Sequence, residues 1–108
     1  MKTILVLSPH PDFAEVIRAA LAPEQFRIVH RTNVDDCEPL MVHGLASVCI
    51  LDADLMGVEN VWVIERLRRR DTKTPLIAYT ANANADWEEE AFLRGVSHVL
   101  AKPVRSRL

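Results

Sequence analysis

The side chains best suited to chemistry in this sequence stand at the ends of short apolar runs. They are Asp52 and Asp54 after residues 48–51, Thr80 after residues 75–79, and Lys102 after residues 99–101. A carboxylate, a hydroxyl and an ammonium group gathered at one edge of a sheet would form a site for an oxyanion or a phosphoryl group. The lysine would supply the positive charge and the threonine a hydrogen-bond donor. Whether these groups meet depends on the elements that carry them.

The apolar runs predict the strands of a parallel sheet. Four of them are apolar on both faces, as central strands covered by helices are: residues 4–7, 48–51, 75–79 and 99–101. A fifth run, residues 26–30, is mixed enough to lie at an edge. Helical patterns lie between the runs, over residues 13–21, 38–43, 61–70 and 86–94.

This alternation predicts an α/β fold of the (βα)4β type, with a doubly wound, five-stranded parallel sheet. Right-handed crossovers place helices on both faces of such a sheet. Ligands collect at the carboxyl ends of its strands. The polar residues named above all lie at those ends, where Ser8, Pro9 and His10 follow the first strand.

Composition limits the class of protein. A chain of 108 residues that is 49% apolar and 26% charged has the size and composition of one globular domain. A net charge of -2 gives no overall attraction to nucleic acid or to an anionic membrane. Cys37 and Cys49 lack metal-ligand spacing. With no signal-peptide pattern and no apolar run near the roughly 20 residues that span a bilayer, the expected location is cytoplasmic.

Several motifs together give the chain a family resemblance. ILDADLMG spans the third predicted strand and its loop, YTA ends the fourth, and EEAFLRGVSHVLAKP covers the last helix and strand. With these motifs the chain resembles, over nearly its whole length, the receiver domains of response regulators in bacterial two-component signalling. The resemblance implies a flavodoxin-like strand order of 2-1-3-4-5.

The resemblance also implies roles for individual residues. Asp52 matches the aspartate that accepts a phosphoryl group from a histidine kinase, Thr80 the switch hydroxyl, and Lys102 the lysine that pairs with the phosphoryl oxygens. Asp52 and the backbone carbonyl of Asp54 match ligands of a Mg2+ ion. Pro103 matches a proline that follows a cis peptide bond.

The chain departs from the receiver pattern at several positions. Ser8 and Pro9 stand where receivers carry two adjacent acids that hold magnesium. Met56 replaces a proline and Val99 replaces the switch aromatic. The fifth helix is expected to be absent or truncated, because the chain ends at Leu108 where that helix should begin.

Two interpretations of Asp52 follow from these departures. In one, Asp52 takes a phosphoryl group weakly, with little or no magnesium. In the other, it is an inherited carboxylate that forms a structural hydrogen-bond set with Thr80 and Lys102 and no longer takes phosphate. His10 is expected either to be exposed or to pair with Asp52, and Asp54 to be a solvated loop residue.

Other notable side chains have surface interpretations. Three histidines have no metal-like spacing and are expected at the surface: His30, His43 and His98. Four arginines are expected to form the solvated end of a helix, with contact to nucleic acid as the alternative: Arg66, Arg68, Arg69 and Arg70. Trp62 is expected to pack beneath a loop, with a partner surface as the alternative.

We expect a single receiver-like domain over residues 1–108. Since a missing fifth helix would bare one face of the sheet, the domain is expected to be excised from a longer regulator or to form a homodimer. It is expected to be a signalling module and not an enzyme. Its expected partners are a histidine kinase or another signalling protein and an output domain, with no membrane and no direct nucleic-acid contact.

The alternative is an aspartate-nucleophile phosphatase of the haloacid dehalogenase type. The order of its nucleophile, acid/base aspartate, hydroxyl and lysine is matched by Asp52, Asp54, Thr80 and Lys102. That family begins with its nucleophilic strand and needs a further acidic motif after the lysine. Here Asp52 lies on the third predicted strand, and only six residues follow Lys102.

Overall fold

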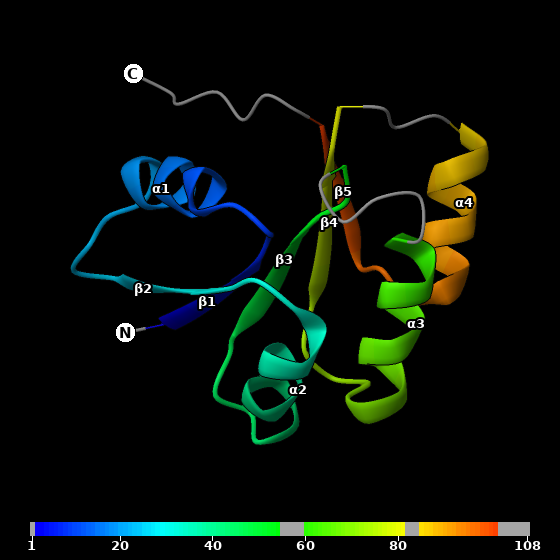
Figure 1. Cartoon of the computed structure of the whole chain (residues 1–108), viewed down its shortest axis with the longest axis horizontal. Coiled ribbons are helices and arrows are strands. Elements are labelled where there is room, and N and C mark those ends of the chain that lie inside the picture. Colours follow the sequence, from blue (N-terminus) through cyan, green and yellow to red (C-terminus); the bar gives the residue numbers. More distant parts are fainter. Residues whose placement is uncertain (1, 55–59, 82–84, 102–108) are drawn as a thin grey trace.

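Strands and helices alternate along the chain as predicted. The computed structural model describes residues 2–54, 60–81 and 85–101. The strands are β1 (Lys2–Leu7), β2 (Phe26–Arg31), β3 (Val48–Asp52), β4 (Leu76–Thr80) and β5 (His98–Ala101). The helices are α1 (Pro11–Ala20), α2 (Val34–Val42), α3 (Asn60–Arg70) and α4 (Ala85–Arg94). Their arrangement is shown in Figure 1.

The strands form one parallel sheet in the order β2-β1-β3-β4-β5. The predicted fold class and strand order are therefore confirmed. β2 lies at one edge and most of its residues are half-buried, whereas five of the six residues of the central β1 are buried. A central strand loses solvent on both faces, which explains why residues 4–7 of β1 are all apolar.

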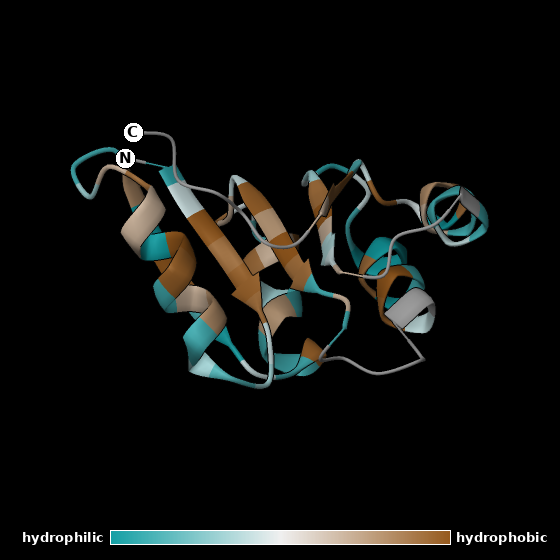
Figure 2. Cartoon of the chain, turned by 90° about the horizontal axis from the view of Figure 1, so that it is seen from above, coloured by the Kyte–Doolittle hydropathy of each residue, from teal (hydrophilic) through white to brown (hydrophobic). Residues whose placement is uncertain are grey.

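Alternate residues of the strands fill two cores on opposite faces of the sheet. From β1, Leu5 and Leu7 pack with α2, α3 and α4. Ile4 and Val6 point the other way and pack with Phe13 of α1. Figure 2 shows the apolar residues concentrated along the strands and on the helix sides that face them.

α1 begins at Pro11, whose fixed φ and missing N–H suit the first turn of a helix. Phe13, Ala14 and Ile17 turn toward the sheet and are buried, whereas Val16 is 48% exposed. Val16, although apolar, therefore lies outside the buried face of α1. Among the described residues, α1 is the sole helix on this face of the sheet, so its flank packs against no second helix.

α2 starts at Val34, and the prediction that it begins at Glu38 is wrong. The Asn33 side chain caps the helix, because its Oδ1 accepts a hydrogen bond from the Asp36 N–H at 3.0 Å. Pro39 lies inside the helix. Proline is common in the first turn of a helix and uncommon further in, so Pro39 gives no sign in the sequence that the helix begins at Val34.

Arg66 of α3 binds α2 and does not simply face solvent. It forms ion pairs with Asp35 and with Glu38, the second at 2.8 Å between Nε and Oε1. Trp62 is 49% exposed and lies beside the same guanidinium, with Arg66 Cζ 5.8 Å from the ring centroid. At this exposure the indole is not packed away from solvent, contrary to the prediction that it lies beneath a loop.

Arg68 connects α3 to the segments around β4 and β5. Its Nε donates to Gly95 O at 2.7 Å and its Nη1 to Thr74 O at 2.6 Å. The interpretation as a solvated helix end is therefore wrong for Arg66 and Arg68 and holds for the exposed Arg69 and Arg70. None of the helices in the described ranges has the length and apolar character needed to cross a lipid bilayer.

Candidate functional site

The carboxyl end of β3 carries Asp52, which is 1% exposed. Asp52 pairs with Tyr79 in the register of β3 and β4, and the next residue, Ala53, donates its N–H to Tyr79 O at 3.0 Å. Thr80 follows Tyr79 at the end of β4. The parallel sheet therefore brings Asp52 and Thr80 to the same edge, as predicted.

Ser8 is fully buried beside Asp52 at the end of β1. Its hydroxyl donates to Asp52 Oδ2 at 3.4 Å, which is long for an O–H···O bond, and Ser8 Oγ accepts the His10 N–H at 3.3 Å. Because a hydroxyl is neutral, this contact adds no negative charge to the site. The His10 side chain is exposed, so this residue contributes its backbone to the site.

His30 of β2 supports the same loop. Its Nε2 lies 2.8 Å from the carbonyl oxygen of Ser8, so this ring nitrogen carries the hydrogen and donates it. His30 is half-buried, and the prediction that it lies at the surface is wrong. Its place at the end of an edge strand beside β1 was the available signal. His43 and His98 are exposed, as predicted.

Asp54 is tied to the end of β4. Its Oδ1 accepts the Thr80 hydroxyl, and its Oδ2 accepts the Ala81 N–H at 2.8 Å. The interpretation of Asp54 as a solvated loop residue is therefore wrong. The turn after β3 brings this carboxylate over the neighbouring strand, where two donors meet it.

Lys102, Pro103 and Met56 lie outside the described residues. Val99, at the position that matches the switch aromatic, is half-buried and packs on the core shared by α2, α3 and α4. Its branched aliphatic side chain is part of the packing of the fold.

The oxygen atoms gathered here are a poor set of ligands for magnesium. A hard cation needs several carboxylate or carbonyl oxygens and water. Ser8 offers a neutral hydroxyl, and both carboxylate oxygens of Asp54 accept hydrogen bonds from protein donors. Across the described ranges, no group of three or more histidine, cysteine, aspartate and glutamate side chains is arranged to hold a metal ion.

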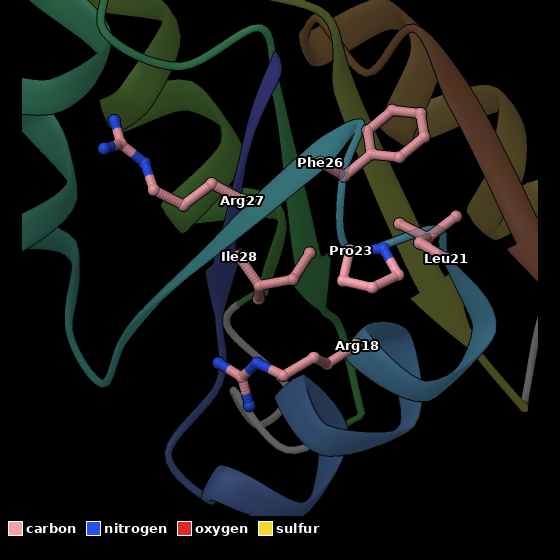
Figure 3. Close-up of a pocket in the computed structure, with 6 residues that line it drawn as sticks. All are labelled: Arg18, Leu21, Pro23, Phe26, Arg27 and Ile28. Atoms are coloured by element: carbon pink, nitrogen blue, oxygen red, sulfur yellow. The ribbon is translucent and has the colours of Figure 1, made fainter. Parts of the chain in front are cut away.

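A separate hollow lies at the other end of β2, between that strand and the end of α1. Figure 3 shows the side chains that line it, which are Arg18, Leu21, Pro23, Phe26, Arg27 and Ile28. Phe26 is the first residue of β2, so this hollow is far along the strand from the edge that carries Asp52. It is not part of the candidate site.

Comparison with known proteins places this geometry in a family. The sequence matches the family model of the response regulator receiver domain over residues 4–108. It is 26% identical over 100 residues to the uncharacterized transcriptional regulatory protein YkoG of Bacillus subtilis, covering 93% of this chain and 44% of that protein. The chain thus spans less than half the length of this curated relative.

Solved structures agree on the fold. A response regulator from Thermotoga maritima superposes with a TM-score of 0.83 at 18% identity, covering 97% of this chain and 87% of that one. The chemotaxis protein CheY4 of Vibrio cholerae gives 0.82 at 16% identity, covering 98% and 90%. At such low identity these similarities concern the fold alone.

Proposed function

Because the chain belongs to the response regulator receiver domain family of two-component signalling, we propose that it is a signalling module. It acts through protein contacts, without efficient magnesium-assisted phosphorylation of Asp52. Receiver domains are generally non-enzymatic signalling modules. This chain differs from the family pattern after β1, where Ser8 and Pro9 replace the two acids that hold magnesium.

The observation that carries the proposal is the buried contact between Ser8 and Asp52. Phosphoryl transfer to a carboxylate concentrates negative charge on the transferred oxygens, and magnesium offsets that charge. Ser8 and Pro9 occupy the positions that match the metal-holding acids, and the Ser8 hydroxyl is turned toward Asp52. Magnesium would therefore bind weakly here, through Asp52 and the backbone carbonyl of Asp54.

The site residues of this proposal follow the receiver pattern. Asp52 is the position that matches the phosphoacceptor, and Thr80 and Lys102 are the positions that match the residues contacting a phosphoryl group. Support for Asp52 and Thr80 comes from their shared edge of the sheet. The role of Lys102 rests on the sequence motif.

The proposed partners are a histidine kinase or another signalling protein on the input side and an output domain on the other. The named relative is a transcriptional regulatory protein about twice as long as this chain. We propose that the described domain is the receiver unit of such a longer regulator.

The phosphatase alternative gains no support from the geometry. Its acid/base group would be Asp54, but that carboxylate is engaged by the Thr80 hydroxyl and the Ala81 N–H. An acid/base residue must instead reach the leaving group of a substrate. We therefore do not propose an enzyme.

The test is a backbone amide NMR titration with Mg2+ and then with beryllofluoride, a mimic of a phosphoryl group on aspartate. The proteins are the unmodified chain, the Asp52→Asn variant, and a Ser8→Asp/Pro9→Asp variant that restores the acidic pair. We expect saturable shifts around Asp52 and Thr80 in the restored variant only.

Saturable shifts in the unmodified chain that vanish in Asp52→Asn would show a working phosphoacceptor and contradict the proposal. The result for the unmodified chain alone decides whether Asp52 is a working phosphoacceptor. The restored variant then shows whether the missing acids are the cause.

A further inference from the structure

Two hydrogen-bond donors at the end of β4 converge on one carboxylate. The Thr80 hydroxyl donates to Asp54 Oδ1, and the Ala81 N–H donates to Asp54 Oδ2 at 2.8 Å. Thr80 is 3% exposed, so its hydroxyl lies in the protein interior. A buried hydroxyl and a backbone N–H are donors of the kind that stabilise anionic oxygens.

These donors lie next to Asp52. The Asp52–Tyr79 register and the Ala53 N–H to Tyr79 O bond of 3.0 Å place Thr80 one residue beyond the level of Asp52 on the neighbouring strand. An oxyanion attached to Asp52 would therefore meet the same hydroxyl and the same N–H. In this structure the carboxylate of Asp54 already holds both.

We propose that Asp54 is a built-in competitor for a phosphoryl-type anion on Asp52. The inference rests on the proposed function, since it concerns the same edge of the sheet. Two effects oppose a phosphoryl-type anion on Asp52. The Thr80 hydroxyl and the Ala81 N–H that would bind it are already bonded to Asp54, and the negative charge of Asp54 repels it. Ser8 weakens magnesium binding, and Asp54 independently withholds the donors.

Thr80 is held in place by this contact with Asp54. Its hydroxyl is bonded to an anionic oxygen in the absence of any phosphoryl group. Asp54 therefore fixes the end of β4 in a bonded arrangement that does not depend on phosphorylation. The residue sets which anion, internal or external, the site accepts.

The experiment measures beryllofluoride affinity, with Mg2+ present, from the amide shift of Ala81. Asp54→Ala is compared with its parent in the Ser8→Asp/Pro9→Asp background, because the unmodified chain is expected not to bind the probe. We expect Asp54→Ala to bind the probe at least about tenfold more tightly, because it releases two charge-assisted hydrogen bonds. Asp54→Asn should give a smaller gain, since its amide loses the charge but keeps one acceptor oxygen.

Loss of charge alone would also favour an anion, so a double-mutant cycle separates the two effects. If released donors carry the gain, adding Thr80→Val to Asp54→Ala removes most of it. If the full gain survives in Asp54→Ala/Thr80→Val, charge alone is responsible and the proposed occupation of the donors is overturned.

An unchanged or weaker affinity in Asp54→Ala also overturns the inference. The same holds if no protein shows a saturable Ala81 shift, because the released donors then hold no oxyanion. Should Asp54→Ala fail to fold, Asp54→Asn takes its place, and an affinity for beryllofluoride no higher than that of its parent overturns the inference. A different result would contradict the proposed function, namely Asp52-dependent binding of the probe by the unmodified chain. In that case the effect of Asp54→Ala is measured in the unmodified chain.

Discussion

At the residue scale, the chemistry of the site depends on contacts that no periodic pattern predicts. Ser8 donates to Asp52, His30 donates to the Ser8 carbonyl, and Asp54 accepts from Thr80. The sequence predicted that Asp52 and Thr80 lie at one edge, because that depends on strand order alone. The pairing of Asp54 depends on the path of a turn, and the partner of His30 is 22 positions away in the chain.

Gly95 gives a prediction at this scale. Its φ is +120°, where L side chains are strained, and an added Cβ would lie 2.5 Å from Arg68 Cγ. We expect Gly95→Ala to lower the free energy of unfolding by about 2–3 kcal/mol, measured by urea denaturation.

Gly44→Ala is the matched control for that measurement. Gly44 has φ +68° and no atom within 4 Å of an added Cβ, so its substitution should cost only about 1 kcal/mol, from backbone strain. Equal losses in the two variants would show that the contact with Arg68 adds nothing.

At the element scale, the order and type of the described strands and helices were predictable, because apolar periodicity reports which faces are buried. The start of α2 was not predictable in the same way, since Pro39 suggests a first turn while Asn33 caps the helix earlier in the chain. The role of Arg68 was also missed. A run of arginines at the end of a helix usually faces solvent, and only the three-dimensional path of the segments after α3 and α4 brings carbonyls to this one.

Arg68→Lys tests the connection between α3 and the last two strands. A lysine keeps the charge, but one ammonium group cannot replace a guanidinium that reaches Gly95 O, Thr74 O and Ser97 Oγ. We expect a loss of about 1–3 kcal/mol in the free energy of unfolding. The exposed Arg69→Lys should change it by less than about 0.5 kcal/mol. A loss no larger in Arg68→Lys than in this control would count against the connection.

At the scale of the whole molecule, the sheet separates two unequal cores. α2, α3 and α4 cover one face and α1 covers the other (Figure 1). On the α1 side five apolar strand residues stay only partly buried: Phe26, Ile28, Val48, Ile77 and Leu100. That a second copy or a further segment completes this face stays a prediction from the sequence.

The larger core predicts a loss of stability at alkaline pH. Burial raises the pKa of the Cys37 thiol from 9.0 to about 12 and raises the pKa of Cys49 well above 9.0. The folded state thus keeps protons that the unfolded state releases. The resulting stabilisation is complete below pH 9 and is lost as the pH rises from 9 toward 12.

Urea denaturation at several pH values measures this effect. The free energy of unfolding should fall less steeply above pH 9 in Cys37→Ala than in the unmodified chain. Comparison of the two proteins removes the contribution of all other groups, which the two proteins share. Parallel curves would show that the Cys37 thiol does not contribute.

Direct phosphoryl transfer tests whether the edge of the sheet around Asp52 lacks efficient magnesium-assisted phosphorylation, as we propose. The unmodified chain and the Ser8→Asp/Pro9→Asp variant are incubated with acetyl phosphate and Mg2+, and phosphorylated protein is measured by intact-mass spectrometry. We expect a phosphoryl adduct in the restored variant, lost when Asp52→Asn is added, and none in the unmodified chain. An Asp52-dependent adduct of similar extent in the unmodified chain would contradict this proposal.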